Sequence, residues 1–219
     1  MVEISCSVLD VEEENSVKTF YNLETAKIDY FHIDVMDGKF VKNNTSTKMR
    51  DYALKISHIS NIPLDVHLMC EDVKKYIDEY IDLKPDRITF HVEAFDRKEE
   101  IIEVIKYLQS NQIKACMAIK PGTKLEEIYE FIPYLHMVLV MTVEPGLGGQ
   151  AIISEMIDRV GILRKYCDEN SLDIDIEVDG GINDSNSQKL INNGANILVS
   201  GNYIIKSEDF NESVKKLKT

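Results

Sequence analysis

Residues 62–91 read IPLDVHLMCEDVKKYIDEYIDLKPDRITFH, and this stretch carries the pattern that decides the fold. It begins with IPLDVHLM and ends with DRITFH, two short runs rich in apolar and β-branched residues that are typical of strands. Between these runs, apolar side chains recur at the spacing of one helix face: Val73, Tyr76, Ile77, Tyr80 and Ile81. The stretch therefore predicts a strand, a helix and a second strand.

The same unit recurs along the whole chain. Six further strand-like runs are EISCSVL (3–9), DYFHIDV (29–35), QIKACMAI (112–119), LHMVLVMTV (135–143), DIDIEV (173–178) and ANILVS (195–200). Alternating βα units have parallel strands and right-handed crossovers, and eight of them favour a closed (β/α)8 TIM barrel over an open doubly wound sheet, the alternative. Successive runs are about one βα unit apart, which leaves no linker, so we expect residues 1–219 to form a single (β/α)8 barrel domain.

The composition is that of an acidic, globular protein. Of the 219 residues, 44% are hydrophobic and 29% are charged, and the formal net charge is −13. Such a chain can build a core, but it repels nucleic acid and anionic lipid. No basic start precedes a signal-like run, and no run approaches the roughly 18 apolar residues of a membrane span. We therefore expect a cytoplasmic protein with no nucleic-acid or membrane partner. Its four cysteines form no C-x-x-C pair, which predicts buried, reduced thiols.

Polar side chains gather at the C-terminal ends of the expected strands, where TIM barrels place their active sites. HIDVMDG contains His32 and Asp34, LDVHLM adds His67, and IEVDGG adds Asp179. The two-residue period of a strand allows all four to point into the barrel. Each alone could be an ordinary hydrogen-bonded polar residue. Together, two imidazoles and two carboxylates suit one divalent ion such as Zn, Fe, Mn or Co.

Glycine-rich loops follow the last three expected strands, in EPGLGGQ, DGGI and SGNYI. Their glycines are Gly146, Gly148, Gly149, Gly180, Gly181 and Gly201. Glycine lets backbone amides approach an anion closely, and loops after strands 7 and 8 are the usual phosphate site of TIM barrels. Tight turns also need glycine, but the placement favours a phosphate site.

Further residues lie at the same strand ends. Three methionines occur there: Met36, Met69 and Met141. They can be core filler, or they can form an apolar cap that keeps water from a reactive intermediate. Asp65 and Glu177 lie deeper, where they are expected to support metal ligands by hydrogen bonding. His91 and Glu93 end the fourth strand, and a structural role is favoured for them over substrate contact.

These motifs resemble the ribulose-phosphate 3-epimerase family along almost the entire chain. The resemblance is carried in order by SCSVL (5–9), YFHIDVMDGKFV (30–41), LDVHLM (64–69), AIKPGT (118–123), VLVMTVEPGLGGQ (138–150), IEVDGGI (176–182) and GANILVSGN (194–202). It implies a TIM barrel of the ribulose-phosphate binding type. It also implies interconversion of D-ribulose 5-phosphate and D-xylulose 5-phosphate in the pentose phosphate pathway, with one divalent metal.

The resemblance also assigns roles residue by residue. It implies that Asp34 and Asp179 are the catalytic acid and base and that they bind the metal together with His32 and His67. The substrate-binding residues it implies are Ser7, His67, Gly146, Leu147, Gly148, Gly149, Gly180, Gly181, Gly201 and Asn202. The family commonly has proline at the positions of Cys6 and Lys42 and serine at that of Asn202, which puts loop shape and affinity in question.

Inversion of a carbon beside a ketone needs one base on each face of the substrate. Asp34 and Asp179 come from strands three positions apart around an eight-stranded ring, so they can flank a substrate at its centre. A metal acting as a Lewis acid would stabilise the enediolate. Two alternatives stay open, an epimerase of another ketose phosphate such as D-allulose 6-phosphate and, more remotely, a non-catalytic phosphate-binding barrel. We also expect a homo-oligomer.

Overall fold

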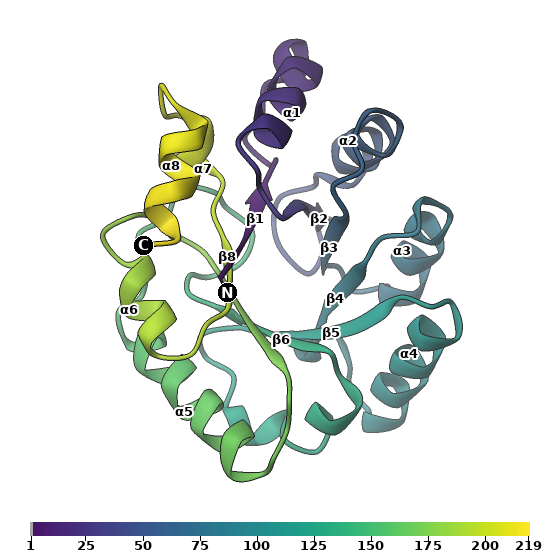
Figure 1. Ribbon diagram of the computed structural model, residues 1–219. Coiled ribbons are helices and arrows are strands. Elements are labelled where there is room, and N and C mark those ends of the chain that lie inside the picture. Colours follow the sequence, from purple (N-terminus) through teal and green to yellow (C-terminus); the bar gives the residue numbers. More distant parts are fainter. Residues whose placement is uncertain (1) are drawn as a thin grey trace.

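The computed structural model describes residues 2–219, and their eight strands pair in chain order into a closed parallel barrel (Figure 1). The strands are β1 (Glu3–Ser7), β2 (Tyr30–Met36), β3 (Leu64–Met69), β4 (Arg87–His91), β5 (Lys114–Ile119), β6 (Met137–Met141), β7 (Asp175–Asp179) and β8 (Ile197–Val199). β8 pairs with β1, with Leu198 opposite Ile4. This closure confirms the TIM barrel and excludes the open doubly wound sheet.

Helices surround the barrel and connect its strands (Figure 1). The α-helices are α1 (Ser16–Thr25), α2 (Ser46–Ile59), α3 (Val73–Tyr80), α4 (Lys98–Ser110), α5 (Glu155–Glu169), α6 (Ser187–Asn192), α7 (Asn202–Ile205) and α8 (Phe210–Leu217). The expected alternation of strand and helix is wrong between β5 and β6. The described segment there has no α-helix, only two 3-10 turns at Leu125–Glu127 and Ile132–Tyr134. Pro121 and Pro133 lie in this short segment, and proline lacks the N–H that a continuing helix needs.

The main hydrophobic core lies between the outer face of the barrel and the helices. α2 shows how the sequence builds it, because its buried residues recur at helical spacing: Met49, Tyr52, Ala53 and Ile56. Burial of one such large side chain stabilises the fold by about 1.5–3 kcal/mol. The Tyr52 hydroxyl donates a 2.9 Å hydrogen bond to the Val11 carbonyl, so its polar end is satisfied within the core.

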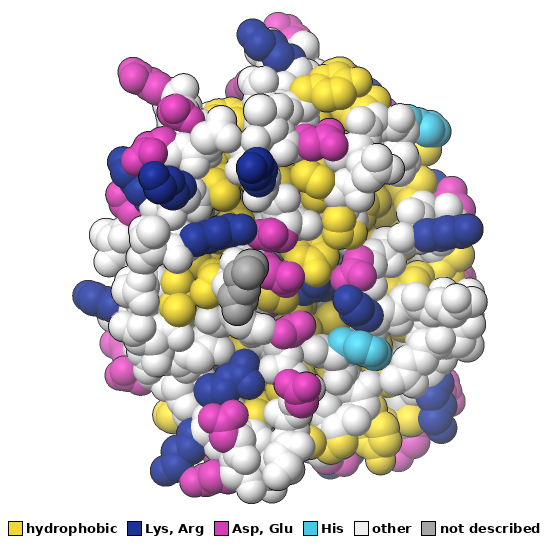
Figure 2. Space-filling model, viewed as in Figure 1, with side chains coloured by type: hydrophobic (Ala, Val, Ile, Leu, Met, Phe, Trp, Pro, Cys, Tyr) yellow, Lys and Arg dark blue, Asp and Glu magenta, His cyan; other side chains and the backbone are white. Residues whose placement is uncertain are grey.

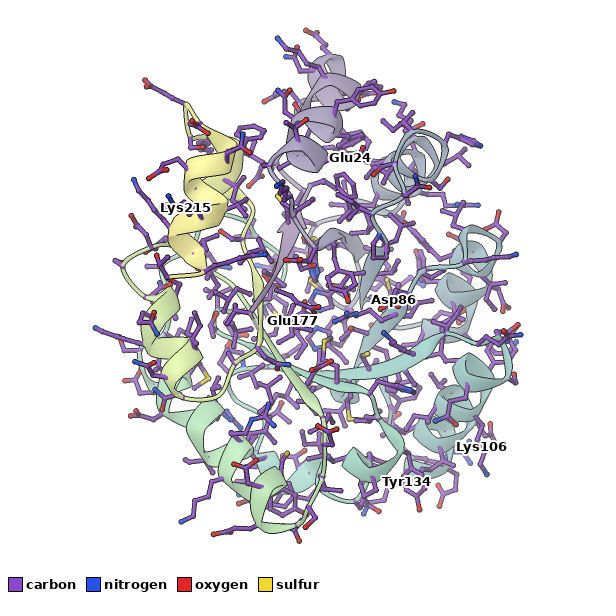
Figure 3. The ribbon with its side chains drawn as sticks, in the orientation of Figure 1. Glu24, Asp86, Lys106, Tyr134, Glu177 and Lys215 are labelled. Carbon is purple, nitrogen blue, oxygen red and sulfur yellow. The ribbon has the colours of Figure 1, made fainter. Side chains whose placement is uncertain are left out.

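Apolar and polar side chains share the inside of the barrel. Cys116, Met137, Leu139 and Ile197 belong to an apolar cluster. Buried charged and polar residues lie among the strands as well: Asp65, Arg87, Glu177, His32 and Thr89. Figure 3 shows Glu177 at the centre of the barrel. Of these polar residues, Asp65 lies 2.8 Å from the His32 ring and hydrogen-bonds to it.

Figure 2 shows one face of the molecule, on which acidic and basic side chains are interspersed. Across residues 2–219, no helix combines the length and apolar character that crossing a membrane requires. All four cysteines are buried and free, as the sequence predicts: Cys6, Cys70, Cys116 and Cys167.

Candidate active site

Four side chains from three strands meet at the C-terminal end of the barrel. His32 and Asp34 project from β2, His67 from β3 and Asp179 from β7, and one ligand atom of each lies within 4.8 Å of the others. The β2–β3 register sets Asp34 directly beside His67. Asp34 Oδ1 lies 3.4 Å from His32 Nε2 and 3.3 Å from His67 Nδ1. The structure thus brings together all four residues that the sequence singled out as metal ligands.

Each of the two histidines has one ring nitrogen that faces this cluster and has no hydrogen-bond partner. His32 Nδ1 lies 2.8 Å from Asp65 Oδ2 and donates its N–H to that carboxylate, so the neutral ring, which is the form that binds a metal, has its lone pair on Nε2. Among the described residues, His32 Nε2 and His67 Nδ1 are buried without a partner. His67 Nδ1 also lies 3.6 Å from Asp179 Oδ2. Two unpartnered imidazole nitrogens facing two carboxylates are the ligand set of a divalent cation, so these residues fit one.

The two aspartates differ in pKa because different neighbouring groups act on each. Burial alone would raise the pKa of Asp34, but when the facing nitrogens of His32 and His67 carry hydrogens, their charge and hydrogen bonding hold that pKa well below its ordinary value. Burial and the neighbouring Asp34 carboxylate raise the pKa of Asp179 to about 6. Such a separation between two nearby carboxyl groups is typical of an acid and base pair.

Hydrogen bonds fix the position of Asp34. The Ser7 hydroxyl donates a 2.6 Å hydrogen bond to Asp34 Oδ2, and the register places Ser7 beside His32. The Thr45 hydroxyl donates to the Asp34 carbonyl at 2.6 Å. Sequence reasoning named Ser7 but missed Thr45, which lies just before α2 and had no signal beyond its place in the loop after β2.

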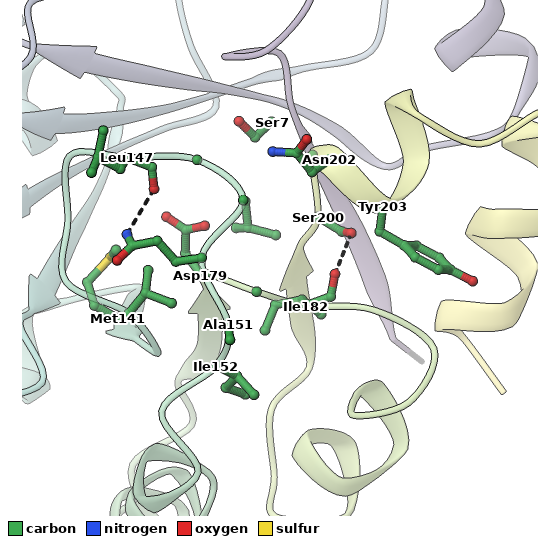
Figure 4. Close-up of a pocket in the computed structure, with 18 of the residues that line it drawn as sticks. Ser7, Met141, Leu147, Ala151, Ile152, Asp179, Ile182, Ser200, Asn202 and Tyr203 are labelled. Atoms are coloured by element: carbon green, nitrogen blue, oxygen red, sulfur yellow. Dashed lines mark hydrogen bonds between the residues drawn. The ribbon is translucent and has the colours of Figure 1, made fainter.

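A pocket of about 630 Å³ opens above the cluster, between the loops that follow β6, β7 and β8 (Figure 4). Its lining includes these predicted residues: Ser7, Asp34, Met36, Met69, Met141, Gly146, Leu147, Gly148, Gly149, Asp179, Gly180, Gly181, Gly201 and Asn202. His32 and His67 are fully buried and lie outside the lining. Leu147 stands at the rim with 64% of its surface exposed.

The three methionines lie in the pocket wall and are almost fully buried. Met36 and Met69 pack together with Val41, and Met141 belongs to the apolar cluster inside the barrel. They are therefore core residues that also face the pocket. Their position fits the apolar cap that the sequence predicts. The cap itself stays a prediction.

Close packing requires glycine in the loop after β7. Gly180 has a φ of +119°, and a Cβ there would lie 2.3 Å from Val143 Cγ2. The expected sixth strand, 135–143, ends early at Met141. The Thr142 hydroxyl just beyond it donates to the carbonyls of Asp179 and Gly180 at 2.9 and 2.6 Å. The two loops are thereby joined at the pocket edge.

Comparison with known proteins identifies the family. The sequence profile of the Ribulose-phosphate 3 epimerase family matches residues 3–205. The chain belongs to the ribulose-phosphate 3-epimerase family. It is 34% identical over 218 residues to a ribulose-phosphate 3-epimerase of Methanocaldococcus jannaschii, covering 100% of this chain and 90% of that protein. It is 33% identical over 215 residues to the chloroplastic ribulose-5-phosphate-3-epimerase of Arabidopsis thaliana, covering 98% and 75%.

Solved structures agree with this assignment at the level of the fold. A crystal structure of a 3-hexulose-6-phosphate synthase superposes with a TM-score of 0.71 and 12% identity, covering 99% of this chain and 98% of that one. The family named from the sequence motifs, an isomerase family of sugar-phosphate metabolism, is thus confirmed by the profile and by the relatives.

Three positions depart from what is common in the ribulose-phosphate 3-epimerase family. Cys6 is fully buried in the core, and Lys42 is exposed in the loop after β2. Asn202 begins α7, and its side-chain N–H donates to Asp10 Oδ2. Asn202 is the only one of the three that lines the pocket, so it is the departure that can alter ligand contacts.

Sequence reasoning missed several residues of the pocket lining: Asp10, Gln150, Asn183, Asn186, Lys189, Tyr203 and Lys206. Gln150 Nε2 donates to the Leu147 carbonyl at 2.9 Å, which closes the glycine loop upon itself (Figure 4). Asn186 Nδ2 donates to the Gly181 carbonyl at 2.8 Å. The signal for both was their position beside the glycine motifs.

The two deeper carboxyls behave differently from each other. Asp65 contacts His32 directly and also accepts a 2.7 Å hydrogen bond from the Ser5 hydroxyl. Glu177 lies within 4.8 Å of Asp65 and His32, yet neither of its oxygens has a hydrogen-bond partner among the described residues. Burial and the Asp65 carboxylate raise the pKa of Glu177 well above its ordinary value. The structure places Asp65, and not Glu177, in hydrogen-bond contact with a predicted ligand.

Proposed function

We propose that this protein interconverts D-ribulose 5-phosphate and D-xylulose 5-phosphate by proton transfer at C3, as the names of its relatives suggest. The observation that carries the proposal is the placement of Asp34 from β2 and Asp179 from β7 in the lining of one pocket, both within 4.0 Å of the partnerless nitrogens of His32 and His67. Inversion at a carbon beside a ketone requires this pair of groups, one to remove a proton and one to deliver a proton to the other face.

The chain's own side chains supply the two proton carriers. Asp34, whose pKa is lowered, is ionised and therefore available to accept a proton, whereas Asp179, with a pKa raised to about 6, holds a proton more strongly than Asp34 does. The hydroxyl of Ser7 holds Asp34 in place through its hydrogen bond. In the reverse direction the roles exchange, because the product of one direction is the substrate of the other.

The same cluster would hold one divalent cation through His32 Nε2, His67 Nδ1 and oxygens of Asp34 and Asp179. When bound, such a cation supplies Lewis-acid stabilisation of negative charge that develops on substrate oxygens. Nitrogen and oxygen ligands suit Zn, Fe, Mn or Co. Met36, Met69 and Met141 in the pocket wall would limit the access of water to the reacting carbon.

The phosphate group of the substrate would bind at the other end of the pocket, against the loops after β6, β7 and β8. Gly148, Gly181 and Gly201 bring main chain to the pocket surface there, and Lys189 and Lys206 add positive charge to its lining. Anchoring the phosphate positions the reactive carbon, so binding energy from a remote group assists the chemical step. An unphosphorylated ketose should therefore react poorly.

The decisive experiment is turnover of D-ribulose 5-phosphate in D2O, with D-allulose 6-phosphate assayed in parallel. Two-base transfer through carboxyl groups that exchange with solvent places deuterium at C3 of the product. Full retention of the original C3 hydrogen in both directions would contradict the mechanism. A higher kcat/KM for D-allulose 6-phosphate would identify that sugar phosphate as the preferred substrate. Absence of turnover with added metals would favour the non-catalytic, phosphate-binding alternative.

We also propose that residues 1–219 work as a single catalytic domain, because the family profile and the closed barrel both extend over nearly the whole chain. The homo-oligomeric state, the cytoplasmic location and the lack of a nucleic-acid partner stay predictions.

A further inference from the structure

His91, the last residue of β4, and Glu93, two residues beyond it, have no part in the mechanism above. His91 is fully buried, and its Nε2 lies 2.9 Å from His67 Nε2. On its other side, His91 Nδ1 lies 3.0 Å from Glu93 Oε2. The Phe40 ring covers His91 at a centroid distance of 4.9 Å. The chain of contacts thus runs from a carboxylate, through one imidazole, to the back of a proposed metal ligand.

The hydrogen-bond partners of Glu93 determine which ring nitrogens of His91 and His67 carry a hydrogen. Its other oxygen, Oε1, accepts a 2.7 Å hydrogen bond from the Lys120 main-chain N–H and one from the Thr123 hydroxyl. Burial alone would raise the pKa of Glu93, but hydrogen bonds from His91 and from the loop after β5 lower that pKa to about 2. Glu93 is therefore ionised and only accepts, so His91 Nδ1 carries the hydrogen that it shares with Glu93.

The hydrogen on His91 determines which nitrogen of His67 carries a hydrogen. Complete burial favours the neutral form of the His91 ring, so a ring that has its hydrogen on Nδ1 offers a lone pair on Nε2. His67 Nε2 must then donate its N–H to His91 Nε2. That leaves the lone pair of His67 on Nδ1, the atom that faces Asp34 and Asp179.

We propose that Glu93 and His91 are a positioning pair that fixes His67 in the tautomer with hydrogen on Nε2, so that Nδ1 is free to bind a metal ion. The proposal rests on the metal site of the proposed function. His32 reaches the same state by a shorter route, through its direct contact with Asp65. Outer partners of this kind typically change metal affinity by about 10- to 100-fold when they are removed.

Glu93→Gln tests the proposal because it keeps the shape of the side chain and replaces one hydrogen-bond acceptor by a donor. The Lys120 N–H can only donate, so the glutamine carbonyl must take the place of Oε1 and the amide NH2 must face His91. His91 Nδ1 then accepts, and its hydrogen moves to Nε2. His67 Nε2 must accept in turn, which puts a hydrogen on Nδ1 and blocks the metal-binding lone pair.

The experiment measures zinc affinity by chelator competition for the wild type, Glu93→Gln and the control Glu126→Gln. Glu126 is exposed on the connection between β5 and β6, which also carries Lys120 and Thr123, so its substitution removes the same charge without touching the hydrogen bonds of Glu93. We expect Glu93→Gln to bind zinc about 10- to 100-fold more weakly than the wild type and Glu126→Gln to bind unchanged. Equal affinity for folded Glu93→Gln and the wild type would overturn the proposal.

A second measurement needs no variant of Glu93. Long-range ¹H–¹⁵N spectra of the metal-free wild type report the tautomer of each ring, with His67 assigned through the missing signal of His67→Gln. Hydrogen on Nε2 of His67 supports the proposal even if Glu93→Gln fails to fold, and hydrogen on Nδ1 refutes it. If the wild type binds no zinc, the metal site of the proposed function fails, while the spectrum still decides the tautomer.

Discussion

Gly181→Ala tests whether the stability and shape of the pocket depend on close packing between the loops after β6 and β7. Gly181 has a φ of +71°, and a Cβ there would lie 2.6 Å from the Ile152 nitrogen and 2.7 Å from the Gln150 carbonyl oxygen. Both atoms are main chain, so neither can rotate away. The Gly181 carbonyl is held in turn by the 2.8 Å hydrogen bond from Asn186. The new methyl group must therefore displace one of the two loops.

The expected cost follows from these two terms. A left-handed conformation costs an L-residue about 1–2 kcal/mol, and insertion of a methyl group into a packed site costs about 1–3 kcal/mol. We expect the free energy of unfolding to fall by about 2–5 kcal/mol in all. Because the displaced loops line the pocket, KM for the sugar phosphate should rise as well.

Gly122→Ala is the matched control. Apart from Gly122 and its two chain neighbours, no heavy atom of the described chain lies within 4 Å of a Cβ built at Gly122, so the free energy of unfolding should change by less than about 0.5 kcal/mol. Urea unfolding followed by circular dichroism gives both free energies, and an unchanged m-value keeps the comparison valid. The reasoning is refuted if Gly181→Ala matches Gly122→Ala within about 0.5 kcal/mol and its KM stays within about twofold of wild type.

Three further predictions concern the proposed site and the thiols. Asp34→Asn and Asp179→Asn should each lower kcat by about 100- to 10,000-fold, because each removes a proton carrier. Activity within tenfold of wild type in a coupled epimerase assay would show that the residue is not a catalytic proton carrier. Chelation should abolish turnover and lower the Tm, since a bound ion stabilises the native state by mass action, and a demonstrably metal-free sample with full activity would contradict the metal site. Burial raises the pKa of all four cysteine thiols, that of Cys6 to about 12, so none should react rapidly with a disulfide reagent at neutral to mildly alkaline pH until urea is added, and fast labelling of a native thiol would show that it is not buried.

Local patterns were sufficient for the barrel and for the four clustered ligands. His32 and Asp34 are two residues apart on one strand, and the period of a strand places them on one face wherever that strand lies. Parallel pairing in chain order then brings His67 beside Asp34. The same local reasoning failed between β5 and β6, where the spacing allowed a helix but the prolines and the packing of the segment gave two short turns.

The sequence by itself determined the alternation of strands and helices, the acidic character and the residue types at the strand ends, because these follow from local periodicity and composition. Only the tertiary structure decided which atoms meet. Glu93 reaches Thr123 and His91 reaches His67 because β3, β4 and β5 stand side by side in the closed barrel. Asp10 reaches Asn202 because β1 and β8 close the ring. Hydrogen-bond partners, and with them histidine tautomers and carboxyl pKa values, depend on distances across strands that no local pattern encodes.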